Sequence, residues 1–383
     1  MEITQVYQLL NGAIQEVLGD TTVVNEDLTN VVDMGVAVFN ANAMDKYVQS
    51  LVNHIGKVIF VNRKYEGGAP SVLMDGWEYG SVCEKISADL PDATENESWE
   101  LTDGVVYEQD TFYQPIVTAK FFNKRVTFEI PVSFTEKQVK QSFSSAEQLN
   151  AFISMIYNEV DKAMTVNLDN LIMRTINSMI YETIKDKYGT GGHTTATGVR
   201  AVNLLYQYNQ QYGTSLNATQ AIHNKDFIRY ASYIMKLYAN RLAKISKLFN
   251  CGGKARFTRR SELKIVLLDE FDAGASVYLQ SDTFHDELVK LPVAETVPFW
   301  QGSGTGYDFS DTSKVIVEKD GDSITTKGII GVMFDRDALG VANLDRRVRS
   351  HVNDKAEFIN NWFKFDAGYF NDLNENFVVF FME

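Results

Sequence analysis

The strongest pattern of hydrophobic and polar positions runs through residues 145–184, where apolar side chains recur every three or four positions. This spacing places the apolar side chains along one stripe of an α-helix. Ser144 or Ser145, followed three residues later by Glu147 or Gln148, resembles a capping box at the helix start. Since no Gly or Pro interrupts the segment, the sequence predicts one helix of about 40 residues, roughly 60 Å long.

Other segments carry shorter helical patterns. Residues 3–18 predict an amphipathic helix, and residues 225–248 predict a second one that ends just before a Gly pair. Residues 271–280 predict a short third helix. Between the first and the longest helix, residues 20–45 indicate an extended arm, and residues 46–61 a helix that runs into a short strand.

Short apolar runs in the second half of the chain predict strands. These runs are residues 264–268, 314–318, 328–334 and 377–382. They alternate with helical segments over short distances, so the sequence predicts a mixed α/β region and an α+β fold class.

The least globular part of the chain is residues 67–131. Its centre, residues 89–97, is acidic and rich in turn-forming residues, whereas residues 126–133 alternate apolar and polar side chains as a half-buried strand does. We interpret residues 72–130 as a long, two-armed β excursion. Excursions of this length are uncommon in compact domains and usually serve a function or contact a partner.

These patterns divide the chain into four parts. Residues 1–66 form an N-terminal helix and arm, and residues 67–131 form the extended β loop. Residues 132–250 contain the long helix, and residues 251–383 contain the mixed α/β region and the C-terminal strands. We expect these boundaries to be approximate and the domain of the long helix to be discontinuous.

Composition narrows the class of function. Aromatic residues make up 12% of the chain, which fits either a large core or extensive subunit association, and the net charge is −14. A protein that reads a DNA sequence needs a cationic surface, which this balance argues against, whereas a container for DNA does not need one. The N-terminus lacks a signal-peptide pattern and no run of 18 apolar residues occurs, so we expect no membrane span.

Candidate chemistry is sparse. Cys83 and Cys251 lie far apart without a CxxC partner, and the five histidines show no metal-binding spacing. The GxGxG run at residues 302–306 lacks the strand and helix of a dinucleotide site. Acidic pairs occur, but chance pairs are expected among 50 acidic residues. We therefore expect no catalytic residue, metal, cofactor or small-molecule substrate, and no enzyme activity.

Two arginine-rich patches stand out. The first contains Arg256, Arg259 and Arg260 with Lys254, and the second contains Arg336, Arg346, Arg347 and Arg349. They can be ordinary solvated loops. Alternatively, since planar guanidinium groups suit paired contacts with carboxylates, they can bind acidic patches of neighbouring subunits, or the backbone of packaged DNA.

The order of predicted elements resembles the HK97 fold of major capsid proteins from tailed bacteriophages. In that family the excursion is an extended loop, the long helix is the spine of a peripheral domain, and the later elements form an axial domain. Two segments, residues 327–340 and 361–377, also look like segments near the end of such proteins. The resemblance implies a shell protein whose pentamers and hexamers enclose double-stranded DNA in the virion, after assembly in the host cytoplasm.

The resemblance also implies partners. We expect a portal protein, a separate scaffolding protein and non-specific contact with packaged DNA. Deleting residues 75–110 is expected to leave a folded subunit that cannot assemble. An encapsulin-like compartment around a cargo enzyme is the alternative with the same fold. The residues expected to contact neighbouring subunits are Phe121, Phe122, Val126, Phe128, Trp99, Arg256, Arg259, Arg260, Arg346 and Arg347.

Overall fold

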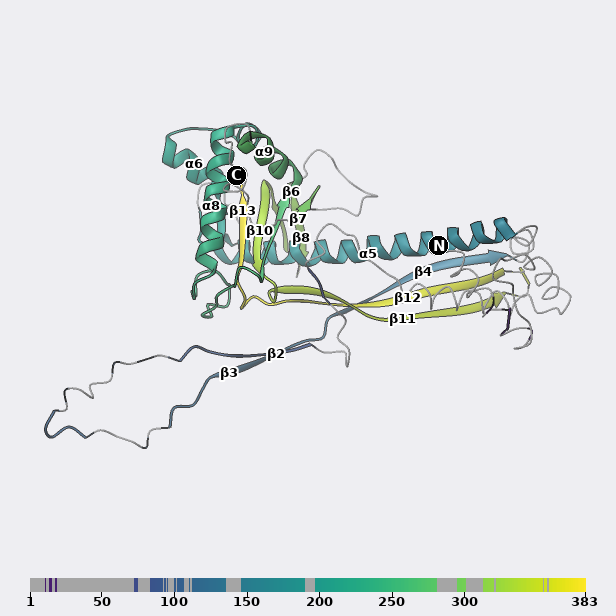
Figure 1. The fold of residues 1–383 in the computed structure, drawn as a ribbon, viewed down its shortest axis with the longest axis horizontal. Helices are drawn as coiled ribbons and strands as arrows, with labels where there is room; N and C mark the ends of the chain where they lie inside the picture. Colours follow the sequence, from purple (N-terminus) through teal and green to yellow (C-terminus); the bar gives the residue numbers. More distant parts are fainter. Residues whose placement is uncertain are drawn as a thin grey trace.

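A computed structural model describes most of the chain from residue 72 onward. The described residues are 11, 14, 15, 18, 72–74, 83–91, 93, 95, 100, 102–106, 110, 112–135, 146–189, 197–280, 295–300, 313–319, 322–353, 355–356 and 358–383. Figure 1 shows three parts: a compact body with the C-terminus, a long helix beside a long sheet, and a two-stranded hairpin that projects away from both.

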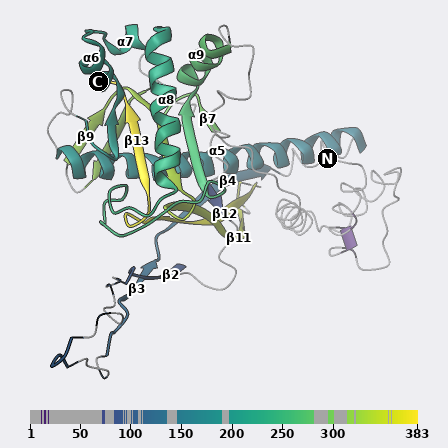
Figure 2. The same cartoon turned by 60° about the vertical axis from the view of Figure 1, so that its left-hand side comes forward.

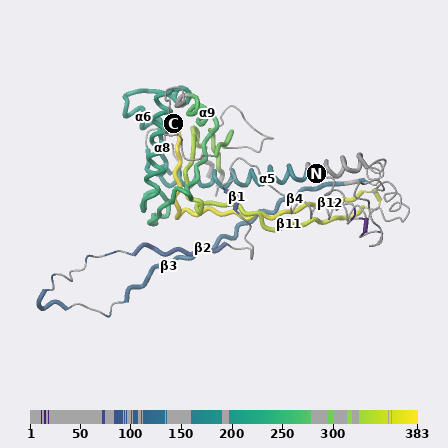
Figure 3. The backbone as a smooth tube through the Cα atoms, in the orientation of Figure 1, coloured from purple at the N-terminus to yellow at the C-terminus, as the bar shows by residue number. Residues whose placement is uncertain are grey.

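The long helix is α5 (Ala146–Tyr188), which runs for 43 residues without a break. The helix predicted at residues 145–184 is therefore confirmed, while its expected cap at Ser144 or Ser145 lies outside the described residues. From Val160 onward its apolar stripe is buried, and between Leu171 and Ile184 most of its circumference is buried. It packs against strands of two different sheets, so it connects the body to the long part of the molecule (Figure 3).

The long sheet lies under α5. Its strands are β1 (Leu73–Met74), β4 (Arg125–Thr135), β11 (Leu339–Asn353) and β12 (Phe358–Asn371). Their order is β1-β11-β12-β4, with β1 parallel to β11 and the other pairs antiparallel. Along β12, buried residues alternate with partly exposed ones, and the buried Ile359, Phe363 and Phe365 belong to the same hydrophobic core as α5.

The compact body is built on a second sheet. Its strands are β5 (Ala201–Asn203), β6 (Leu263–Leu268), β7 (Glu295–Val297), β10 (Ile329–Asp335) and β13 (Phe377–Phe381). Their order is β5-β13-β10-β6-β7. Every residue of β10 and β13 is buried, because both faces of this sheet are covered.

Opposite faces of the second sheet contact different helices. The helices are α6 (Leu204–Tyr212), α7 (Ala218–Ala221), α8 (Lys225–Leu242) and α9 (Asp269–Gln280). In β13, Val378 and Phe380 pack with the core that contains α6, α8 and α9, whereas Val379 and Phe381 pack with the core that contains α5. Figure 2 shows α8 in front of this sheet and α5 behind it.

Asparagine side chains start three of these helices. Asn203, Asn217 and Asn224 each accept a hydrogen bond from a backbone N–H in the first turn of α6, α7 and α8 respectively. These bonds satisfy donors that the helix itself leaves free, so the polar residues fix where each helix begins.

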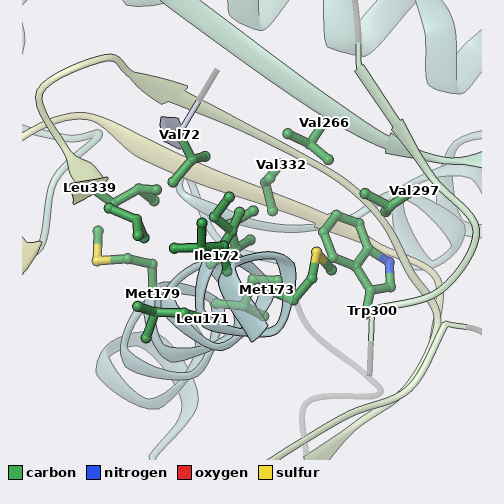
Figure 4. Close-up of a cluster of buried hydrophobic side chains, with 14 of the residues drawn as sticks. Val72, Leu171, Ile172, Met173, Met179, Val266, Val297, Trp300, Val332 and Leu339 are labelled. Carbon is green, nitrogen blue, oxygen red and sulfur yellow. The ribbon is translucent and has the colours of Figure 1, made fainter. Parts of the chain in front are cut away.

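The centre of the core is formed where α5 passes the second sheet. Trp300 is fully buried there, its indole N–H donates to the carbonyl of Ile329 at 2.8 Å, and Asn177 of α5 donates to the Trp300 carbonyl at 2.6 Å. Figure 4 shows Trp300 beside Met173 and Val297, with Ile172 between α5 and Val332. Trp300 thus joins the helix to the sheet by packing and by hydrogen bonds.

Most of the predicted elements are confirmed. The predicted strands correspond to β6, β10, β13 and β8 (Val315–Lys319), which pairs with β9 (Asp322–Thr326). The predicted helices at residues 225–248 and 271–280 correspond to α8 and α9. α8 ends earlier than predicted, at Leu242, whose carbonyl accepts from the backbone N–H of Thr258 at 2.8 Å instead of from the next helical turn.

Some expectations lie outside the described residues, and one feature was missed. Four positions of the predicted first helix are described, and all four are helical: Asn11, Ile14, Gln15 and Leu18. The arm at 20–45, the helix and strand at 46–61 and the GxGxG run at 302–306 are not described. The long strands β11 and β12 were not predicted. None of the described helices is long and apolar enough to cross a bilayer.

The two sheets do not follow the linear division of the chain. β4 crosses the expected boundary at residue 131 and lies in the long sheet, not in the projecting hairpin. β11 and β12, from the last third of the chain, return to the long sheet, while β5 and β13 lie side by side in the body. Segments far apart in sequence therefore alternate between the two parts (Figure 3).

Candidate assembly surface

The projecting hairpin consists of β2 (Cys83–Ala88) and β3 (Val117–Phe122). The strands are antiparallel, with Cys83 opposite Phe122 and Ala88 opposite Val117. Beyond them the backbone N–H of Asp89 still donates to the carbonyl of Ile116 at 2.9 Å. Figure 1 shows the hairpin and the loop beyond it extending away from the rest of the subunit.

The two faces of the hairpin differ in chemistry. Side chains alternate between faces along each strand, and the exposed face carries Ile86, Val117 and Phe121 together with two alanines and Glu84. The half-buried face carries Lys85 and Lys120, which lie directly opposite each other. Among the described residues, the face with the two lysines therefore points toward its own subunit, and the more apolar face points toward solvent.

The apolar surface continues along the loop beyond the strands. Phe112 and Tyr113 have relative exposures of 84% and 85%. The other exposed large hydrophobic residues in the described part of the hairpin and loop are Ile86, Leu90, Val105, Val106, Ile116, Val117 and Phe121. Exposed apolar groups concentrated on one projection mark a surface for another protein.

The root of the hairpin is held by ion pairs with the segment between β12 and β13. Lys120 donates to Asp372 at 2.8 Å, and Lys85 lies 3.0 Å from Asp372 and 2.8 Å from Glu375. Lys85 also donates to the carbonyl of Asp337 at 3.1 Å. The Asp372 side chain is almost fully buried, so two lysines from the hairpin meet one buried carboxylate of the body.

These contacts shift the pKa values of the groups. Burial by itself would lower the pKa of Lys85 and raise the pKa of Asp372. The hydrogen bond and charge of Glu375 outweigh burial at Lys85, whose pKa is raised, and the hydrogen bond from Lys120 with the charge of Lys85 lowers the pKa of Asp372. Both groups therefore remain charged near neutral pH and fix the root of the hairpin.

Replacing Asp372 with Asn is expected to destabilise the subunit at pH 7 by about 1–3 kcal/mol, because the buried partner of both lysines loses its charge. A lowered carboxyl pKa gives stability that is present above the unfolded pKa of about 4 and is lost as the pH falls through the folded value. The raised pKa of Lys85 gives stability that is present below about pH 10.4 and is lost as the pH rises through the folded value. Urea unfolding should be measured between pH 7 and pH 3. The difference in the free energy of unfolding between Asp372→Asn and wild type should become smaller as the pH falls.

Asp345→Asn is the matched control for this prediction. Asp345 is largely exposed and shares Arg347 with Asp366, so its replacement should change the free energy of unfolding by less than about 0.5 kcal/mol. Equal effects of the two substitutions at pH 7 would contradict the proposed role of Asp372.

Two further contacts fix the direction of the hairpin. Lys254 of the body pairs with Asp89 at 2.7 Å, just beyond β2. Phe122 packs against Phe370 of β12 with the ring centroids 5.1 Å apart. The hairpin therefore leaves the body in a defined direction although its outer face is open.

Of the five apolar residues expected at subunit contacts, the structure describes four and places them in different surroundings. Phe121 lies on the exposed face of the hairpin with a relative exposure of 63%, but Phe122 faces its own body. Val126 and Phe128 belong to β4 and pack against the core of their own subunit, Phe128 stacking on Phe365 at 4.9 Å. Their placement on the excursion was wrong because the excursion ends before β4. Trp99 lies outside the described residues.

The five arginines expected at subunit contacts also differ in their surroundings. Arg256 pairs with Glu375 at 3.1 Å and Arg347 pairs with Asp366 at 2.7 Å, both within the subunit. Arg346 donates to Asn343 at 3.2 Å. Arg259 and Arg260 are exposed, and the described contact of the Arg260 guanidinium is with the amide oxygen of Asn240. Of these five arginines, Arg259 is the one whose side chain has no partner among the described residues.

Sequence reasoning missed the residues that hold and extend the surface. Asp372 and Glu375 lie in the C-terminal segment, and their pairing with Lys85 and Lys120 joins positions more than 250 residues apart. The exposed aromatic pair Phe112 and Tyr113 could have been found as apolar residues inside a turn-rich, acidic stretch. Among the described segments, no three His, Cys, Asp or Glu side chains are grouped to hold a metal ion.

The chain is similar to chains in two solved phage structures. A chain in the solved structure of the head fiber and inner core protein of native bacteriophage P68 is 9% identical, with a TM-score of 0.53, over 85% of this chain and 86% of that one. A chain in the capsid structure of Staphylococcus phage Andhra is 8% identical, with a TM-score of 0.49, over 84% and 86% of the two chains. At this identity the P68 likeness shows the fold, and no curated protein matches the chain.

A family model supplies the assignment. The model of the Phi29-like phage major capsid protein matches residues 10–381, which is nearly the whole chain. The fold is accordingly the HK97-like capsid fold of the α+β class, with an extended hairpin and a spine helix. The protein is a subunit of the phage head shell and is located in the virion capsid. The chain belongs to the Phi29-like phage major capsid protein family.

Proposed function

We propose that this head-shell protein assembles into pentamers and hexamers that enclose double-stranded DNA, and that it acts without catalysing a reaction. The observation that carries the proposal is the apolar outer face of the β2–β3 hairpin, which the described part of its own subunit leaves uncovered. Closed symmetric assembly repeats one weak contact many times, so a modest interface per subunit is sufficient.

The occupant of this surface is a neighbouring copy of the same chain. Family membership supports a homo-oligomer, and an apolar face on a rigidly rooted projection suits a partner whose position is fixed by symmetry. The family match also favours a phage shell over the encapsulin-like compartment that the sequence left open. We place Phe121 at this contact, together with the exposed Phe112 and Tyr113.

We further propose two domains. The long sheet and most of α5 form the peripheral domain, and the second sheet with α6, α7, α8 and α9 forms the axial domain. Because β11 and β12 return to the long sheet, the peripheral domain is discontinuous in sequence. The long sheet and the body meet along α5, which allows the subunit to act as one rigid tile.

Portal protein, a separate scaffolding protein and non-specifically bound DNA are the proposed partners. The net charge of −14 supports loose contact with DNA, since a container with this charge does not hold phosphates tightly. Scaffold dependence is the part of this proposal that an assembly experiment tests directly.

Electron microscopy of the purified recombinant chain, alone and co-expressed with a scaffolding candidate from the same genome, is the test. We expect closed shells of uniform diameter with five-fold and six-fold capsomers, and a higher yield with the scaffold. A species that remains monomeric by sedimentation velocity under both conditions would refute assembly by this chain.

A further inference from the structure

Charge is strongly segregated between two segments of the chain. Residues 89–116, here named the acidic loop, contain eight Asp or Glu residues and no Lys or Arg. Residues 241–260, here named the basic segment, contain seven Lys or Arg residues and no Asp or Glu. The basic segment therefore has the opposite sign of charge to the chain as a whole, whose net charge is −14.

Both segments also expose large apolar side chains. The acidic loop exposes Val105, Val106, Phe112 and Tyr113, while the basic segment exposes Ile245, Leu248 and Phe257 at 45–57%. Neither set is covered by the described part of its own subunit. Each segment therefore combines one sign of charge with an apolar surface, and the signs are opposite.

The basic segment is a fixed platform. Ser246 and Arg256 exchange two backbone hydrogen bonds, of 2.9 and 3.1 Å, and the buried Asn250 side chain bonds the backbone N–H and carbonyl of Lys254. Phe249 is buried, and its carbonyl accepts from the N–H of Phe377 at the start of β13. A surface held in this way loses little conformational entropy when a partner binds.

Several charges of the platform have no partner among the described residues of the subunit. Lys254 and Arg256 pair with Asp89 and Glu375, as described above. Lys244, Lys247 and Arg259 are exposed, and their side chains form no hydrogen bond or ion pair with the described residues. These three cations are directed at solvent or at another molecule.

We propose that the acidic loop of one subunit docks on the basic segment of an adjacent copy. This inference rests on the proposed function, because it assigns a partner surface to the same hairpin. Within one subunit, Lys254 pairs with Asp89 at 2.7 Å at the root of the loop, and we expect contacts of the same kind between subunits. Beyond Asp89 the described part of the loop extends away from its own body (Figure 1). Its described carboxylates are exposed and are left for a second copy: Glu95, Glu100, Asp103 and Asp110.

Packaged DNA is the competing partner for a basic surface. DNA phosphates would match the lysines and arginines but would leave Ile245, Leu248 and Phe257 without apolar partners. The acidic loop supplies both carboxylates and apolar side chains. The second copy is therefore favoured, and DNA binding becomes an outcome of the test.

Charge exchange tests the docking. Lys244→Glu with Lys247→Glu, and separately Glu100→Lys with Asp103→Lys, are each expected to lower the yield of shells about tenfold or more, because like charges then face each other. Combining all four substitutions in one chain should restore at least half of the wild-type yield. Shells are counted by electron microscopy after sedimentation, with a scaffold present if wild type requires it.

Lys162→Glu with Lys355→Glu is the control for net charge. Both lysines are exposed and belong to neither segment, so this variant should assemble like wild type. Wild-type yield from both single-segment variants would overturn the docking but leave the proposed shell function intact. Normal assembly of Lys244→Glu with Lys247→Glu, combined with weakened DNA retention in filled heads, would assign the basic segment to DNA instead.

Zero-length carbodiimide crosslinking locates the contact directly. Shells assembled from a mixture of ¹⁴N-labelled and ¹⁵N-labelled subunits should give mixed-isotope crosslinks between peptides of the acidic loop and Lys244 or Lys247. The Lys254–Asp89 pair, which lies within one subunit, should give same-isotope crosslinks and serves as the internal standard. Mixed-isotope links that join the acidic loop to other lysines only would overturn the proposal.

Discussion

Replacing residues 90–115 by an Asn-Gly turn is expected to abolish shell assembly while the subunit remains folded. Asp89 and Ile116 are already hydrogen-bonded across the hairpin, so a two-residue turn can join β2 to β3 there. The removed segment exposes most of its described side chains and therefore contributes little to the stability of the monomer. It contributes both the apolar residues and the carboxylates that we assign to the neighbouring copy.

Sedimentation velocity measures this outcome. The shell fraction should fall about 100-fold or more, because every symmetry-related contact is weakened at once. The free energy of unfolding should change by less than about 1 kcal/mol. This design is sharper than deleting residues 75–110, which would also remove β2 and the ion pairs of Lys85. Full-sized shells from the turn variant would rule out a role for the acidic loop in assembly.

Trp300→Ala is expected to give the largest loss of stability, about 3–5 kcal/mol. The indole is fully buried between α5 and the second sheet, and its N–H satisfies the Ile329 carbonyl (Figure 4). Truncation leaves a cavity and an unpaired acceptor at the point where the helix joins the body. Urea unfolding monitored by circular dichroism measures the effect.

Phe112→Ala is the matched control for an aromatic truncation. Phe112 is 84% exposed, so its loss should change stability by less than about 0.5 kcal/mol while weakening assembly. The opposite ranking, with Phe112 more costly to stability than Trp300, would mean that the described core is wrong.

Local patterns were sufficient for many elements because each depends on neighbours in sequence. α5 was predicted from its apolar spacing alone, and β13 from a continuous apolar run. β11 and β12 were missed because Asn, Asp, Arg and Gly residues interrupt their alternation. These strands are stabilised by pairing with each other and with β4. Because β4 lies far from them in the sequence, a local pattern does not contain this pairing.

The candidate surface was predicted only in part. The sequence located a projecting β segment and included Phe121 on it, and it singled out the basic cluster of Arg259 and Arg260. It could not separate Phe121 from Val126, because that depends on where β3 ends and β4 enters the long sheet. Asp372 could not be identified either, because the sequence contains many carboxylates. Only the fold brings Lys85 and Lys120 next to this one.

The sequence by itself determined the class of the protein: a long uninterrupted helix, an acidic β excursion and an α+β remainder, which together resemble a capsid subunit. Periodicity and composition are properties of the chain, so folding does not alter them. The tertiary structure decided which face of the hairpin is open among the described residues, and which charges are neutralised inside the subunit. Those outcomes depend on distances between residues far apart in the sequence, which are fixed only when the strands and α5 have packed.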